Sequence, residues 1–293
     1  MRLRERAPAK INLGLHVLRK RPDGYHDVET VLHRIDWADT ITAEPADTLS
    51  MTCSDPALPT DEANLCMQAA RALAEASGVT SGAALHLNKQ VPYGAGLGGG
   101  SSDAAATLRL LARLWELNPS PDALHDIARQ IGADVPFFLG EAPAAYATGR
   151  GDNLTPLRHE GRPYRLPYSI LVVVPPVEVA TPEAYAHVTP DEAERPHLPS
   201  LLRTNDLAQW RSSLVNDFES PIATAHSEVA AARDWLRGEG ADYVSLSGSG
   251  GAVYALFENS SRAQAVRARG NDRPERMHLA WSPDDRARAP MGS

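Results

Sequence analysis

Hydrophobic and polar residues alternate along residues 7–18, which is the period of a β-strand with one buried face. The apolar positions share one face, which we expect to be buried: Ala9, Ile11, Leu13, Leu15 and Val17. The other face carries Lys10, Asn12, Gly14 and His16. Because Gly14 leaves room above this second face, the pattern suits a ligand lying across the strand.

The period of two residues for strands and of about 3.6 residues for helices predicts further elements in the first half of the chain. The expected strands cover residues 28–35, 39–44, 83–91 and the start of 146–151. The expected helices cover residues 60–76, about 101–117 and 122–131. Ser101 and Ser102 are the residue types that cap a helix N-terminus, and Gly132 is a natural helix stop.

Residues 158–167 are polar and contain proline, so we place a domain boundary there and expect domains at 1–160 and 161–282. The apolar, β-branched run at 168–175 predicts a central strand of the second domain. The elements expected after it are a helix that Thr181 caps with Pro182 in its first turn, a loop at 190–206, a helix from after 216 to about 237 and a strand–turn–strand at 243–257. Residues 283–293 are charged, and we expect them to fray.

The composition is that of an ordinary globular protein, with 43% hydrophobic and 23% charged residues. The formal net charge of −8 argues against nucleic acid as the main partner, because binding to phosphate backbones requires a basic surface. The 2 cysteines provide no disulfide framework, and no apolar run approaches the ~20 residues of a membrane span. We therefore expect a cytoplasmic protein with no membrane or nucleic-acid partner.

A glycine-rich stretch from Pro92 to Ser102 is the strongest chemical signal in the chain. Five glycines occur within seven residues: Gly94, Gly96, Gly98, Gly99 and Gly100. An Ala- and Leu-rich helix is expected to follow them. Backbone without Cβ atoms that leads into a helix N-terminus lets several N–H groups converge on one anion. The stretch therefore predicts a phosphate-binding loop.

Three known types of glycine-rich loop compete for this stretch. Gly94-x-Gly96-x-x-Gly99 matches the dinucleotide fingerprint by letter, but another helix, not a second strand, is expected after the long helix, so no βαβ unit closes. A Walker A motif requires Lys where Gly100 stands. The HRD and DFG triplets of protein kinases are absent. A triphosphate loop of another kind fits the context best.

Several separated motifs, in this order, resemble those of the GHMP kinases, small-molecule kinases that include galactokinase, homoserine kinase and mevalonate kinase. They are PAKINLGLHV, RPDGYHDVET, VPYGAGLGGGSSDAA, IGADVPFFL and LSGSGGAVYALF. The resemblance extends from Ala7 to about Phe257. It implies a two-domain α+β fold, with an N-terminal domain of the ribosomal-protein-S5 type and a C-terminal, ferredoxin-like α+β domain.

Within the family, the motifs most resemble the kinases that phosphorylate the 2-hydroxyl of a cytidyl-diphosphate sugar alcohol in the non-mevalonate isoprenoid pathway. That resemblance implies ATP, with Mg²⁺, as the phosphate donor. It implies phosphate contacts from Pro92, Gly94, Ala95, Gly96, Leu97, Gly98, Gly99, Gly100, Ser101 and Ser102. It also implies that Asn64 and Lys89 line the adenine side, although capping a helix is the better interpretation of Asn64.

The resemblance also implies catalytic and substrate-binding residues. Asp134 matches a general base and Lys10 its basic neighbour. Asp134 lies between a helix stop and an apolar run, so we expect it to be partly buried. The positions that match substrate contacts are Asn12, Tyr25, His26, Thr181 and Tyr185. Tyr25 would stack on cytosine, His26 would bind its polar edge and Tyr185 would cover the far face.

Two other functions compete with this one. A homoserine or mevalonate kinase would share the glycine loop but would not need a cytosine site at Tyr25, His26 and Tyr185. An RNA-binding module built on the S5-like domain conflicts with the net charge of −8 and with the ATP loop. We expect small-molecule substrates and a monomer or weak homodimer, and the sequence does not identify protein ligands for the metal.

Overall fold

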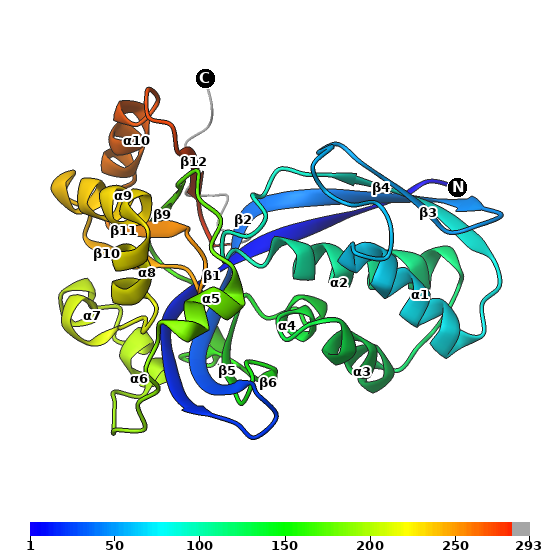
Figure 1. The fold of residues 1–293 in the computed structure, drawn as a ribbon, viewed down its shortest axis with the longest axis horizontal. Coiled ribbons are helices and arrows are strands. Elements are labelled where there is room, and N and C mark those ends of the chain that lie inside the picture. Colours follow the sequence, from blue (N-terminus) through cyan, green and yellow to red (C-terminus); the bar gives the residue numbers. More distant parts are fainter. Residues whose placement is uncertain (283–293) are drawn as a thin grey trace. The chain divides into compact units, whose positions relative to one another are not determined.

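The computed structural model describes residues 1–282 (Figure 1). The chain forms two compact units, and the first comprises Met1–Ala9, Trp37–Tyr93 and Gly98–Glu141. The second comprises Lys10–Asp36, Gly94–Leu97 and the chain from Ala142 onward. The long strands β1 (Leu3–Lys20) and β2 (His26–Ala46) contribute residues to both units. The domain division at 160/161 stays a prediction, and the tail at 283–293 lies outside the described residues.

The first unit combines strands with helices. Residues 40–46 of β2 pair antiparallel with β4 (Gly82–Asn88), and β3 (Ser50–Cys53) pairs parallel with β4. Its helices are α1 (Leu65–Ser77), α2 (Gly99–Leu114), α3 (Pro121–Ile131) and the short α4 (Val135–Leu139). Helices α1 and α2 pack side by side against one face of the sheet (Figure 1).

The described part of the second unit contains three groups of strands. Residues 30–33 of β2 pair with β5 (Ala144–Thr148), which pairs with β6 (Asn153–Pro156). A four-stranded antiparallel sheet has the order β10 (Tyr243–Leu246), β11 (Val253–Phe257), β9 (Ser169–Val174) and β12 (Arg276–Ala280). A small hairpin joins β7 (Arg158–His159) and β8 (Arg162–Pro163). The prediction of a central strand at 168–175 is confirmed.

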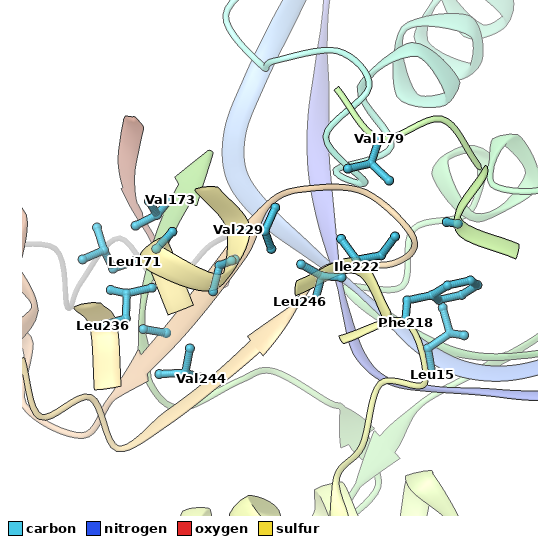
Figure 2. Packing of buried hydrophobic residues seen from close by; sticks show 14 of the residues in the cluster. Leu15, Leu171, Val173, Val179, Phe218, Ile222, Val229, Leu236, Val244 and Leu246 are labelled. Atoms are coloured by element: carbon cyan, nitrogen blue, oxygen red, sulfur yellow. The ribbon is translucent and has the colours of Figure 1, made fainter. Parts of the chain in front are cut away.

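Six helices accompany these strands among residues 142–282. They are α5 (Thr181–Ala186), α6 (Leu198–Arg203), α7 (Leu207–Ser213), α8 (Glu219–Ala225), α9 (Ser227–Gly238) and α10 (Ser260–Arg269). Figure 2 shows how apolar side chains of β9, β10, α8 and α9 meet in one core, with Leu15 and Phe218 at its edge. Every residue of β9 is buried, which explains why its sequence after Ser169 is continuously apolar instead of alternating.

Several predicted boundaries were wrong. The strands expected at 28–35 and 39–44 form the single 21-residue strand β2, because no glycine or proline separates them. Helix α1 begins at Leu65, not at residue 60. The helix expected up to residue 237 divides at His226 into α8 and α9. The loop expected at 190–206 contains α6, whose Pro199 lies in its first turn, where proline is tolerated.

The second face of β1 does not remain open for a ligand along its length. A Cβ atom on Gly14, whose φ is +73°, would lie 2.8 Å from side-chain carbons of Leu198 and Leu214. His16 on the same face is also buried. Gly14 therefore makes room for protein packing, while the apolar face is buried as predicted. In the described part of the chain, no helix is long and apolar enough to cross a membrane.

Candidate active site

Three glycines of the glycine-rich loop have positive φ angles, in the left-handed region of backbone conformation. Gly94, Gly96 and Gly98 have φ values of +67°, +82° and +68°, which side-chain-bearing residues rarely adopt. Helix α2 begins directly after Gly98, whose position at the N-cap provides no side-chain hydrogen bond. The first N–H groups of α2 therefore have no side-chain cap and suit an anionic ligand. Ser101 and Ser102 lie inside the first turn, so the prediction that they cap the helix was wrong.

In the second unit, Lys10 is fixed beside the glycine loop. Its ammonium donates hydrogen bonds to Asn12 Oδ1 (2.6 Å) and to the carbonyl oxygen of Gly96 (2.9 Å). Asn12 in turn donates to Thr30 Oγ1 (2.9 Å). Both Lys10 and Asn12 are buried. This chain of hydrogen bonds holds a cation against the carbonyl oxygen of Gly96 in the glycine-rich loop.

A second glycine turn, residues 247–251, packs directly onto residues 94–97. Ser247 Oγ donates to the Gly96 carbonyl oxygen (2.9 Å), and the backbone N–H of Ala252 donates to the Ala95 carbonyl oxygen (3.0 Å). A Cβ atom on Gly96 would overlap the Ser247 carbonyl oxygen, and one on Gly250 would overlap the backbone of Ala95 and Gly96. No site residue was expected in this turn, although a run of glycines is typical of close backbone approach.

In the first unit, Lys89 lies buried between two carboxylates. Its ammonium lies 2.6 Å from Asp39 Oδ2 and 2.8 Å from Asp103 Oδ2. Burial by itself would lower the pKa of Lys89, but the two carboxylates outweigh burial and raise it. Burial also raises the pKa of Asp103, although Lys89 opposes that change. The ammonium lies 3.0 Å from where a Cβ of Gly99 would be, so this triad supports the first residue of α2.

Asn64, predicted to line the adenine side, caps helix α1. Its Oδ1 accepts a hydrogen bond from the Cys66 N–H (2.9 Å), and its Nδ2 donates to the Pro59 carbonyl (2.8 Å). The capping interpretation is confirmed. Both functional groups of this amide are engaged locally, as is the Lys89 ammonium. Contacts from either residue to adenine stay predictions.

Asp134, the predicted general base, precedes the five-residue helix α4 in the first unit. It has helical backbone angles (φ −83°, ψ −15°), and its carboxylate makes no capping hydrogen bond. The side chain is half-buried, as predicted, next to the buried run from Val135 to Phe138. The carboxylate is therefore not used to complete the helix end, which is the ordinary structural role of an Asp at this position.

Four of the five predicted substrate residues line one cavity of about 610 Å³ in the second unit: Tyr25, His26, Thr181 and Tyr185. The rings of His26 and Tyr185 are stacked, with centroids 4.6 Å apart and 18° between their planes. Burial, together with the charge of Lys20, lowers the pKa of His26, which favours the neutral imidazole. Asn12 is not among the residues that line this cavity.

The charge of the cavity is one-sided. Lys20 and Arg150 line it, and no Asp or Glu is among the described lining residues, although Asp152 pairs with Arg150 from outside them. The remaining lining residues are apolar or small: Gly24, Pro182, Ala186, Val188 and Pro190. Aromatic rings next to cationic side chains suit a flat heterocycle that carries phosphate groups.

The described residues offer few candidate ligands for a metal ion. Over residues 1–282, no group of three or more His, Cys, Asp or Glu side chains is placed to hold one. The hydroxyls of Ser101 and Ser102, in the first turn of α2, lie where the phosphate loop enters the helix. Ser101 is partly exposed there, while Ser102 is fully buried.

Comparison with known proteins identifies relatives for both halves of the chain. The family description "GHMP kinases N terminal domain" matches residues 64–141, and "GHMP kinases C terminal" matches residues 198–275. A 4-diphosphocytidyl-2-C-methyl-D-erythritol kinase from Salinibacter ruber is 64% identical over 284 residues, which cover 97% of this chain and 100% of that protein.

Solved structures agree with these sequence matches. The crystal structure of a 4-(cytidine 5'-diphospho)-2C-methyl-D-erythritol kinase has a TM-score of 0.76 and 34% identity, and the match covers 95% of this chain and 98% of that chain. A homoserine kinase from Cytophaga hutchinsonii has a TM-score of 0.71 and 19% identity, over 96% of this chain and 94% of that chain. The second match shows a shared fold alone.

Proposed function

Because this chain belongs to the GHMP kinase family and has its two-domain α+β fold, we propose that it transfers the γ-phosphate of ATP to the 2-hydroxyl of 4-diphosphocytidyl-2-C-methyl-D-erythritol. The observation that carries the choice of substrate is the cavity lined by Tyr25, His26, Tyr185, Lys20 and Arg150. Homoserine and mevalonate have neither an aromatic base nor a diphosphate, so they would not use the aromatic and cationic groups of this cavity.

In this proposal the cytosine stacks on Tyr25, and His26 forms hydrogen bonds with its polar edge. Tyr185 covers the far face of the base, and Thr181 and Asn12 contact the rest of the substrate. Because the rings of His26 and Tyr185 are only 4.6 Å apart, a base cannot lie between them. The His26 ring must therefore leave the face of Tyr185 when the substrate binds.

The phosphates of ATP are assigned to the loop from Pro92 to Ser102. Its positive-φ glycines and the uncapped N–H groups of α2 fit a chain of phosphates, which is the support for this assignment. Mg²⁺ bound to ATP would neutralise phosphate charge and needs few protein ligands, for which the Ser101 and Ser102 hydroxyls are the candidates. Asn64 and Lys89 are assigned to the adenine side, through backbone atoms because their side chains are engaged.

The chemistry requires an oriented alcohol and compensation of charge more than a strong nucleophile. We assign Asp134 the role of accepting the proton of the 2-hydroxyl as its oxygen bonds to phosphorus, a role worth about 10²–10⁴ in rate. Lys10 is assigned as the electrostatic partner of Asp134 and as the group that stabilises charge on the transferred phosphate. The Lys10 ammonium is already oriented by Asn12 and Gly96, so it needs little reorganisation.

The proposal is tested by coupling ADP release to NADH oxidation with three alcohols in parallel. The cytidyl substrate should support turnover, while homoserine and mevalonate should give the rate of ATP alone. Turnover with homoserine or mevalonate, and none with the cytidyl substrate, would show that the chain is another GHMP kinase and that the cavity serves a different ligand.

A further inference from the structure

Arg150 contacts the ring that is proposed to stack on the substrate base. It follows β5, in the turn that leads to β6. Its guanidinium carbon lies 5.2 Å from the centroid of the Tyr25 ring, within the range of a cation–π interaction. Nη2 of Arg150 lies 2.9 Å from Oδ2 of Asp152, whose side chain is only 14% exposed. Arg150 is therefore held by a carboxylate while its guanidinium lies over one face of the Tyr25 ring.

Tyr25 needs such support because it is 58% exposed. The backbone of its turn is fixed, since the Arg21 N–H donates to the Tyr25 carbonyl (2.7 Å) and the Tyr25 N–H donates to Asp23 Oδ1 (3.1 Å). Those bonds set the position of the backbone but not the angle of the ring. An exposed ring that rotates freely loses side-chain entropy when a base stacks on it, and this loss weakens binding.

We propose that Arg150 is a positioning residue for the nucleoside: it holds the Tyr25 ring in one orientation, so that the opposite face is ready to stack on the cytosine. This inference rests on the proposed function, because it concerns the same cavity. The interaction between guanidinium and ring is the essential feature, and the attraction between Arg150 and the substrate diphosphate is secondary. Arg150 thereby determines the affinity for the nucleotide part of the substrate and not the rate of phosphate transfer.

Steady-state kinetics separate this role from general stabilisation. We expect Arg150→Ala to raise KM for the cytidyl substrate about tenfold, which corresponds to about 1.4 kcal/mol. The kcat and the KM for ATP should not change. Arg150→Lys, which keeps a cation near the ring, should recover most of the loss. In a Tyr25→Ala background, Arg150→Ala should have no further effect, because the ring that it positions is gone.

Arg19→Ala is the matched control. Arg19 lies in the same hairpin and pairs with Asp27 (2.7 Å), but it does not line the cavity, and Asp27 keeps Arg21 as a partner. This variant should have the wild-type KM for both substrates. An equal rise in KM for Arg19→Ala and Arg150→Ala would mean that the hairpin as a whole had moved, and would overturn the assignment to Arg150.

Ligand-observed NMR with cytidine and with cytidine diphosphate tests directly whether Arg150 positions the Tyr25 ring. If Arg150 positions Tyr25, Arg150→Ala weakens the binding of both ligands. Weakened binding of the diphosphate alone would overturn the proposal in favour of direct phosphate recognition, and unchanged binding of both would overturn it altogether. A wild-type enzyme that binds cytidine but does not phosphorylate the cytidyl substrate would contradict the proposed function. It would not contradict the role of Arg150 in positioning Tyr25.

Discussion

Gly96→Ala tests whether the close packing of the two glycine turns is needed for the phosphate loop. A Cβ atom at this position would overlap the Ser247 carbonyl oxygen and lie 3.0 Å from the Gly250 nitrogen. Both neighbours are backbone atoms and cannot rotate away. The peptide of Gly96 would have to move, and it would lose its hydrogen bonds from Lys10 and Ser247.

The magnitude has two parts. An alanine at φ +82° costs about 1–2 kcal/mol because its Cβ crowds its own backbone. Overpacking against Ser247 and Gly250 adds about 1–3 kcal/mol. Gly161→Ala is the matched control, because Gly161 has φ +76° and nothing lies within 4 Å of its Cβ position. Gly161→Ala therefore has the backbone cost of a positive φ without the cost of overpacking.

Urea denaturation followed by tryptophan fluorescence gives the free energy of unfolding of both variants. We expect Gly96→Ala to be less stable than Gly161→Ala by about 1–3 kcal/mol, the overpacking cost. We also expect a raised KM for ATP in Gly96→Ala only. Equal free energies of unfolding and a wild-type KM for ATP would refute the idea that this close approach shapes the loop.

Three further predictions concern charged groups. Asp134→Asn should lower kcat by about 10²–10⁴ while ATP still binds, measured by single-turnover kinetics and calorimetry; near-normal turnover would remove Asp134 as the base. Lys89→Met should lower the free energy of unfolding by about 3–5 kcal/mol, because it leaves the buried carboxylates of Asp39 and Asp103 without their cation, and an added Asp103→Asn should restore part of the loss. Burial and the nearby Arg165 lower the pKa of His33 to about 3 from 6.5, so its NMR signals should not titrate between pH 5 and 8. As the pH falls below 6.5, the unfolded state should bind a proton that folded His33 does not bind, and this site should reduce stability; a midpoint near 6.5 would contradict that assignment.

Much of the fold follows from local patterns in the sequence. Alternation locates β1, and the continuous apolar run locates β9, because burial on one or two faces directly selects the residue types. The hairpin of β10 and β11 is equally visible, since glycines separate two apolar runs. Motifs shared with the GHMP kinases predicted that Tyr25 and Tyr185 contribute to one substrate site. Both residues line one cavity, although 160 positions separate them in the sequence.

The parts that were missed depend on contacts between distant residues. Lys89 and Asp39 are 50 positions apart, and neither has a local pattern that reveals the other. Arg150 and Tyr25 lie in separate connecting segments, and no periodicity in the sequence reveals that their side chains meet. Gly14 was expected to leave room for a ligand above the strand, but Leu198 and Leu214 fill that space. Such outcomes depend on which segments pack together, and single-residue preferences do not determine this.

The position of the transferred phosphate is the most direct test of the account. In a substrate with a 2-C-methyl group, the carbon that carries the 2-hydroxyl bears no hydrogen. After incubation with ATP, Mg²⁺ and the cytidyl substrate, ³¹P NMR should therefore show a new phosphate monoester without coupling to a hydrogen on the ester carbon. A monoester coupled to such a hydrogen, or no new ester at all, would contradict the proposed reaction.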